Sequence, residues 1–234
     1  MKIISSVYQL TVFLANHSKK GSLGFIPTMG ALHKGHASLI KRSLSQNALS
    51  ICSIFVNPTQ FNNKTDFKNY PNRLNEDIKL LKEIGCNVVF TPSKEDIYPS
   101  GLPSSVFDFG LLDKVMEGAS RPGHFNGVAM VVSRLFDIIK PQRAYFGEKD
   151  FQQLAVIKSL AAQKFKHIEI VPCATLREKD GLAMSSRNLL LNKRYRAAAP
   201  RIYQRLLCVQ SRAKNNSITE LRSLVANAFK KDRD

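Results

Sequence analysis

Two histidines and two glycines lie close together where an apolar run passes into a helical pattern. Segment 27–36 reads PTMGALHKGH and contains Gly30, His33, Gly35 and His36. A helix N-terminus directs backbone N–H groups and a positive dipole end at a bound anion. Glycines let the backbone approach a phosphate closely, and two imidazoles one turn apart can donate to phosphate oxygens as charge builds up on them. The segment therefore predicts a phosphate site used in catalysis.

Two further segments carry cations and hydroxyls suited to phosphates. Segment 147–150, GEKD, follows a short apolar run and opens a helical pattern, so it belongs at the carboxyl edge of a parallel sheet, where ligands bind. Segment 184–187, MSSR, offers two hydroxyls and a guanidinium, which suit a triphosphate. Alone, the first is typical of a helix-capping turn and the second of a serine-rich loop. Because both segments occur in the same chain as segment 27–36, we favour a functional role for both.

Short apolar runs alternate with helical patterns over most of the chain, which indicates βαβ units and a parallel sheet in an α/β fold. Leu74, Ile78, Leu81 and Ile84 follow helical spacing, and Asn72 is the predicted cap before them. From residue 192 the chain is helical and basic, and a domain boundary is expected near residue 175. The expected strands are 22–27, 50–56, 87–90, 144–146 and 168–172, and the expected helices are 35–46, 72–84, 125–139 and 149–163.

Composition narrows the class of protein. The chain has 234 residues, of which 44% are hydrophobic and 23% charged, so it has an ordinary globular composition. No apolar run approaches the roughly 20 residues of a membrane-spanning helix, and residues 1–20 lack a signal-peptide pattern. The four cysteines are widely spaced, which argues against a zinc cluster or a disulfide scaffold. We expect a cytoplasmic protein without a membrane partner.

The basic charge is concentrated at the C-terminal end. The net charge is +17, and from Lys193 onward eleven Lys or Arg stand against three acidic residues, 11 − 3 = +8. A basic tail fits an acidic partner such as nucleic acid, but a solvated helix surface has the same composition. We favour the solvated surface over a nucleic-acid partner.

Seven ordered segments, which carry six motifs, resemble the pantoate–β-alanine ligase family, a branch of the His-x-Gly-His nucleotidyltransferases related to class I aminoacyl-tRNA synthetases. The resemblance extends from about residue 20 to residue 190. Besides segment 27–36, it rests on SIFVNPTQF (53–61), YPNRLNED (70–77), FTPSKEDIYP (90–99), GASRPGHFNG (118–127), YFGEKDFQQL (145–154) and DGLAMSSRN (180–188).

The resemblance implies an ATP-dependent condensation of pantoate with β-alanine. In the family's reaction, pantoate and ATP form pantoyl adenylate and pyrophosphate, and β-alanine then displaces AMP to give pantothenate. It implies ATP as substrate, Mg²⁺ and a homodimer. It also implies a Rossmann-like parallel sheet with helices on both faces over residues 1–175, which binds nucleotide and pantoate. A small, mainly helical lid domain is expected over 176–234, shorter than the family usually carries.

The resemblance also assigns roles to individual residues. The catalytic residues are His33, His36 and Lys149. The residues expected to bind pantoate and β-alanine are Thr28, Asn57, Gln60 and Gln153. The residues expected to bind the metal are Glu76 and Asp77. A larger set of residues is expected to bind ATP: Met29, Gly30, Ala31, Leu32, His33, Lys34, Gly35, His36, Gly147, Glu148, Lys149, Asp150, Leu176, Met184, Ser185, Ser186 and Arg187.

Two alternatives stay open. One is a nucleotidyltransferase of the same superfamily that releases pyrophosphate but makes no amide; Gln60 and Gln153 favour the ligase over it. The other is a nucleic-acid-binding module that keeps the fold without the activity, which the full set of motifs disfavours. The histidines at 17, 124 and 167 receive no role from the sequence.

Overall fold

The computed structural model describes residues 1–17, 21–101 and 106–231, and the chain divides into two compact units, Met1–Thr175 and Leu176–Asp234. The first unit is built on a six-stranded sheet in the order β1-β4-β3-β2-β5-β6, in which every strand pair is parallel. The strands are β1 (Lys2–Ile4), β2 (Leu23–Thr28), β3 (Leu49–Ile54), β4 (Val88–Phe90), β5 (Arg143–Gly147) and β6 (Glu169–Cys173).

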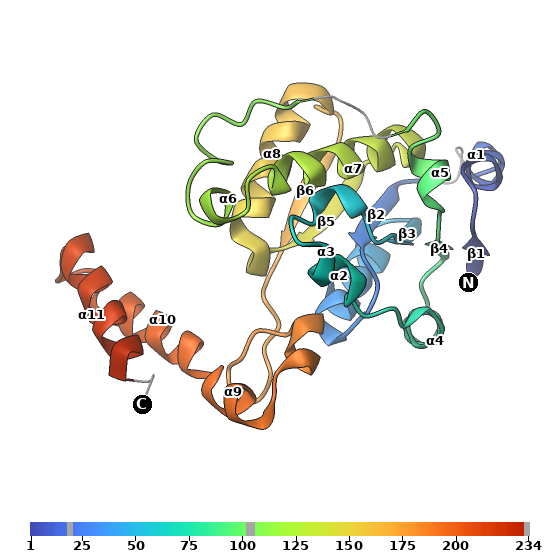
Figure 1. The fold of residues 1–234 in the computed structure, drawn as a ribbon. Helices are drawn as coiled ribbons and strands as arrows, with labels where there is room; N and C mark the ends of the chain where they lie inside the picture. The colour runs from blue at the N-terminus through green and yellow to red at the C-terminus, as the bar shows by residue number, and fades with distance from the viewer. Residues whose placement is uncertain (18–20, 102–105, 232–234) are drawn as a thin grey trace. The chain divides into compact units, whose positions relative to one another are not determined.

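Helices cover both faces of this sheet, because alternate residues of each strand are apolar on opposite sides. Phe25 and Ile51 point into one core with helices α1, α7 and α8, whereas Ile26 and Cys52 point into a second core with α2 and α4. Figure 1 shows α7 and α8 on one side of the strands and α2 on the other. The predicted α/β class, with helices on both faces, is confirmed. The helices and turns of this unit are α1 (Val7–Ala15), α2 (Lys34–Gln46), η1 (Pro58–Gln60), α3 (Lys64–Lys68), α4 (Leu74–Ile84), α5 (Lys94–Ile97), α6 (Glu117–Ser120), α7 (His124–Ile139), η2 (Glu148–Asp150) and α8 (Phe151–Lys164).

The strand order changes direction at β2. The chain moves from β2 to β3 on one side, whereas β5 pairs with β2 on the other. In an open parallel sheet, ligands bind in the crevice beyond the carboxyl ends of the strands at such a switch point. The register pairs Phe25 with Ala144, and counted on by three residues it brings Thr28 level with Gly147. The two predicted phosphate segments therefore follow neighbouring strand ends.

The second unit is helical, as expected. It contains η3 (Ser186–Leu190), α9 (Lys193–Ala198), α10 (Arg201–Arg212) and α11 (Ile218–Lys231). Before them, an isolated antiparallel bridge joins Arg177 and Ala183. Among all the described residues of both units, no helix is long and apolar enough to cross a membrane.

The structure differs from the sequence-based expectation in several places, and α1 is a helix that the expected set lacks. Lys2–Ile4 adds a sixth strand at the sheet edge, which three residues with one buried side chain do not reveal in the sequence. The cap of α4 is Arg73, which makes no side-chain capping bond, and not Asn72. The stretches between the expected strands 50–56 and 87–90 and the helices that follow them contain η1, α3, α5 and α6, which are too short to show a period.

Candidate active site

The turn between β2 and α2 has an unusual backbone. Gly30 and Ala31 both have positive φ, +80° and +49°, a region that a side chain makes costly. Thr28 stabilises its start, because the hydroxyl donates to Ser53 O at 2.7 Å and accepts from the Gly30 N–H at 3.2 Å. Thr28 is buried and both bonds are internal, so it supports the turn from below.

Asp77, from α4, is attached to the middle of the same turn. Its two carboxylate oxygens accept from the backbone N–H groups of Ala31 and Leu32, at 2.8 and 2.6 Å. Burial raises the pKa of the Asp77 carboxyl, and the two N–H bonds act in the opposite direction. Asp77, which the resemblance assigned to a metal, thus lies against the turn between β2 and α2.

His33 and His36 form a reciprocal cap at the start of α2. His33 Nδ1 accepts from the Gly35 N–H at 3.1 Å, and His36 Nδ1 accepts from the His33 N–H at 3.3 Å. The ring centroids lie 4.1 Å apart. Because each Nδ1 is an acceptor, a neutral ring must carry its proton on Nε2. Neither Nε2 bonds to another residue of the described chain, so both are available as donors.

Both imidazoles are held neutral. Burial lowers the pKa of His36 to about 3, with further lowering by His33 and by the Lys149 ammonium. Burial also lowers the pKa of His33, Lys149 adds to that effect, and Asp150 opposes it. The electrostatic influence of Lys149 on both rings shows that the turn after β5 faces the turn after β2.

The turn after β5 is much more open. Glu148, Lys149 and Asp150 are exposed, and the Lys149 ammonium pairs with the Asp150 carboxylate at 2.9 Å. Neither η2 nor α8 begins with a side-chain capping bond. A Cβ added at Gly147 would meet nothing within 4 Å. The Lys149 ammonium is thus exposed and, among the described residues, pairs only with its neighbour in the chain.

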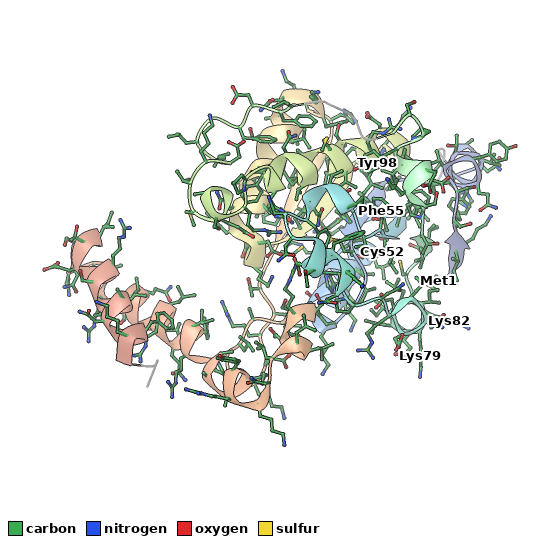
Figure 2. The ribbon with its side chains drawn as sticks, viewed as in Figure 1. Met1, Cys52, Phe55, Lys79, Lys82 and Tyr98 are labelled. Carbon is green, nitrogen blue, oxygen red and sulfur yellow. The ribbon has the colours of Figure 1, made fainter. Side chains whose placement is uncertain are left out.

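Asn57 organises the turn after β3, where Gln60 lies. Its amide donates to Thr59 Oγ1 at 2.8 Å and Gly127 O at 3.1 Å, and its carbonyl accepts from the Tyr98 hydroxyl at 3.0 Å. Tyr98 also packs on Phe55, with ring centroids 6.4 Å apart; both are labelled in Figure 2. Asn57 is buried and fully bonded, so it shapes the site from within the protein.

Gln60 is attached to the first turn of α7. Its carbonyl oxygen accepts from His124 Nδ1 at 2.7 Å, and Arg121 Nη1 donates to His124 Nε2 at 3.1 Å. Arg121 also pairs with Glu117 at 2.6 Å. A Cβ at Gly127 would lie 2.3 Å from Thr59 O, so only glycine lets α7 pack this close. The side-chain amide of Gln60 faces the thioether of Met29, a weak acceptor.

Two consecutive glutamines at the start of α8 have different environments. The Gln152 amide is buried, donates to Leu112 O and Val115 O at 2.6 and 2.8 Å, and accepts from the Glu117 N–H at 3.0 Å. Gln153 is half-buried, and its amide bonds to no other described residue. Gln152 therefore supports the loop before α6, and Gln153 has a free amide for a ligand.

The remaining predicted residues belong to the second unit. Met184 N donates to Leu176 O at 3.0 Å, and Ser185 caps η3 by accepting from the Arg187 N–H at 3.3 Å. Ser186 is buried, whereas Arg187 is exposed. These bonds bring the MSSR segment and Leu176 together within that unit.

The predicted metal pair gains no support from the geometry. Among the described residues, no group of three or more His, Cys, Asp or Glu side chains is arranged to hold a metal ion. Glu76 is exposed and pairs with Arg73 at 3.4 Å, and both Asp77 oxygens are engaged by backbone N–H groups. Of the two, only Glu76 keeps a carboxylate available to solvent.

Sequence reasoning missed the residues that act through others. Tyr98, Arg121, His124 and Gly127 all lie inside segments that carry the resemblance, and this was the only signal for them. Their partners are distant in the chain, so no local pattern reveals the contacts.

This chain is an α/β protein whose parallel sheet carries a histidine-bearing turn at its switch point. A family model described as Pantoate-beta-alanine ligase matches residues 2–234. The pantothenate synthetase of Cytophaga hutchinsonii is 49% identical, over 92% of this chain and 76% of the relative. That of Bacteroides thetaiotaomicron is 48% identical, over 98% and 81%. The chain belongs to the pantoate–β-alanine ligase family, and the resemblance seen in the sequence is confirmed.

Solved structures agree with this assignment. The pantothenate synthetase of Thermus thermophilus superimposes with a TM-score of 0.92 at 42% identity, over 99% of this chain and 83% of that one. The pantoate–β-alanine ligase of Francisella tularensis, solved in complex with Beta-gamma ATP and Beta-alanine, has a TM-score of 0.84 at 44% identity. The match covers 87% of this chain and 78% of that one.

Proposed function

We propose that this chain condenses pantoate with β-alanine at the expense of ATP, with release of AMP and pyrophosphate. The observation that carries the proposal is the pair of neutral imidazoles at the switch point, each with Nε2–H free to donate. Family membership and the Francisella complex with Beta-gamma ATP and Beta-alanine support it.

In the first step, a carboxylate oxygen of pantoate attacks the α-phosphorus of ATP, and the bond to the pyrophosphate oxygen breaks. Negative charge grows on the phosphate oxygens in the transition state. His33 and His36 donate Nε2–H bonds to those oxygens, and Lys149 supplies a full positive charge from the opposite turn. Donors fixed before the reaction are typically worth about 10²–10³ each in rate. The surrounding nucleotide site is formed by Gly30, Ala31, Leu32, Lys34, Gly35, Gly147, Glu148 and Asp150.

In the second step, the neutral amine of β-alanine attacks the acyl carbon of pantoyl adenylate. The bond from that carbon to the phosphate oxygen breaks, AMP leaves, and the amine loses a proton as the amide forms. The same imidazole and ammonium donors stabilise the departing phosphate.

We place pantoate between the turn after β3 and the start of α8. The Gln153 amide has no partner among the described residues, and the Gln60 amide has two weak ones, because its nitrogen faces the Met29 sulfur and its oxygen accepts from Asn57 at 3.4 Å. An amide both donates to and accepts from hydroxyl groups. Thr28 and Asn57 are fully bonded within the protein, so their part is to support the pocket.

In the second unit, Leu176, Met184, Ser185, Ser186 and Arg187 are proposed to bind adenine and triphosphate. Mg²⁺ bound by the triphosphate would offset phosphate charge, and Glu76 is the predicted ligand whose carboxylate is free of backbone bonds. We further propose a cytoplasmic homodimer, as the resemblance implies. The four cysteines are free thiols, which suits a reducing compartment.

Isotope exchange separates this ligase from the alternatives. Pantoate without β-alanine should support exchange of labelled pyrophosphate into ATP, because adenylate formation is reversible. Pantothenate and stoichiometric AMP should appear only when pantoate, β-alanine and ATP are all present. Absence of pantoate-dependent exchange would rule out the two-step mechanism, and exchange without amide would indicate a nucleotidyltransferase.

A further inference from the structure

The side chain of Asp77 joins α4 to the turn between β2 and α2. It is 3% exposed, and its oxygens accept two short bonds from the turn, 2.8 Å from Ala31 N and 2.6 Å from Leu32 N. These two amides precede α2, so they have no partner in the helix. Without Asp77, two consecutive donors, one buried and one half-buried, would be unpaired.

The turn requires this external support because its backbone is strained. Ala31 carries a side chain yet has φ of +49°, and Gly30 before it has φ of +80°. A Cβ on Gly30 would lie 3.0 Å from Asp77 Oδ2, so the carboxylate packs directly on the turn. A residue stays in such a conformation only when its surroundings determine it.

The support passes to the catalytic imidazoles through the backbone. Leu32, which donates to Asp77, immediately precedes His33, and the His33 N–H in turn donates to His36 Nδ1. The orientation of Leu32 thus fixes the bond that holds His36 in its Nε2–H form.

We propose that Asp77 is a positioning residue, which holds residues 30–32 in the left-handed turn and so keeps His33 and His36 aimed at the ATP phosphates, and that it is not a magnesium ligand. The proposal rests on the proposed function for the identity of the ligand. Its geometric part concerns only contacts within the first unit.

The test uses Asp77→Ala and Asp77→Asn in the full chain, with Glu83→Gln as a matched control at an exposed acidic residue of α4. Long-range ¹H–¹⁵N spectra of the imidazoles report the tautomer of each histidine. In the unmodified chain His33 and His36 should show Nε2–H, and His124 should show Nδ1–H because it donates to Gln60 O. Asp77→Ala should give mixed tautomers at His33 and His36 without metal present, and no change at His124.

The kinetic arm measures kcat, the KM for pantoate and the free Mg²⁺ concentration for half activation. We expect kcat to fall about 10²-fold in Asp77→Ala and about 10-fold in Asp77→Asn, which keeps one acceptor, because misplaced catalytic groups cost this much. The pantoate KM and the Mg²⁺ requirement should stay within about twofold of the unmodified values. If Asp77→Ala does not fold, both the imidazole spectra and the kinetics are measured on Asp77→Asn.

Unchanged tautomers with kcat within about twofold would overturn the proposal, as would unchanged tautomers with a raised Mg²⁺ requirement. Failure of the unmodified chain to exchange pyrophosphate would contradict the proposed function alone, because the imidazole spectra need no substrate.

Discussion

The turns after β2 and β5 follow neighbouring strands, yet their side chains are held to very different degrees. In the turn after β2, Thr28, Asp77 and both histidines are bonded to the backbone before any substrate arrives. In the turn after β5, the side chain of Lys149 is 36% exposed and pairs only with its neighbour Asp150 among the described residues. A hydrogen-bonded array of donors thus stands beside an exposed charge. Donors that must point at developing charge need prior order, whereas an ammonium acts from many orientations.

The largest expected effect separates activity from stability. His36→Ala and Lys149→Ala should each lower the rate of pyrophosphate exchange by about 10²-fold or more. His36→Ala should also lower the free energy of unfolding by about 1–3 kcal/mol, because it leaves the His33 N–H unpaired. Lys149→Ala should change it by less than about 0.5 kcal/mol, since exposed ion pairs contribute little. Urea unfolding measures the free energy of unfolding of each variant. The control is Lys158→Ala, which changes an exposed lysine of α8. A clear loss of stability in Lys149→Ala would contradict the comparison.

The second prediction concerns acid. An unfolded histidine takes up a proton as the pH falls through about 6.5, whereas His36 in the folded chain does so only near its pKa of about 3. Between these values the unfolded state binds more protons, so stability falls as the pH falls. At pH 4.5 the loss from His36 should be about 2–3 kcal/mol relative to pH 7.

The His36→Gln variant lacks this group and isolates its contribution. Unfolding free energies of the unmodified chain and the variant are measured at pH 7 and 4.5, and the unmodified chain should lose about 2–3 kcal/mol more than the variant between these values. A constant difference would mean that His36 is already protonated or solvated in the folded chain.

The adjacent glutamines of α8 provide the third test. Gln152→Ala should cost about 1–3 kcal/mol of stability, because three backbone groups lose their partner. Gln153→Ala should leave stability unchanged and raise the pantoate KM about 10-fold, which corresponds to about 1.4 kcal/mol. Substrate kinetics and thermal unfolding of both variants decide this, and the reverse pattern would show that α8 is rotated from its orientation in the structure.

The smallest effect is expected at the glycines. Gly30→Ala should destabilise the chain by about 1–2 kcal/mol, because it puts a side chain at positive φ and close to Asp77. Gly147 has φ of −77° and open space around it, so Gly147→Ala should change the stability by less than about 0.5 kcal/mol. Denaturant midpoints of the two variants measure the contrast, and equal losses would show that the turn after β5 is as constrained as the turn after β2.

The sequence by itself determined the parts whose signals are local. The runs that form β2, β3 and β5 are mostly apolar and buried without strict alternation, because a parallel strand is buried on both faces. The histidines and glycines of segment 27–36 and the GEKD segment directly follow such runs, so their place at the carboxyl edge could be read from the chain. The alternation of strands and helices fixed the α/β class for the same reason.

Only the tertiary structure decided what each polar side chain does. Asp77 lies 46 residues from Ala31, and His124 lies 64 residues from Gln60, so neither pairing leaves a periodic or spacing signal. Gln152 and Gln153 are chemically identical, and the packing of α8 alone turns the first inward and leaves the second free. The resemblance assigned the Asp77 carboxylate to a metal. In the structure it accepts from two backbone N–H groups, because the fold leaves those donors no other partner.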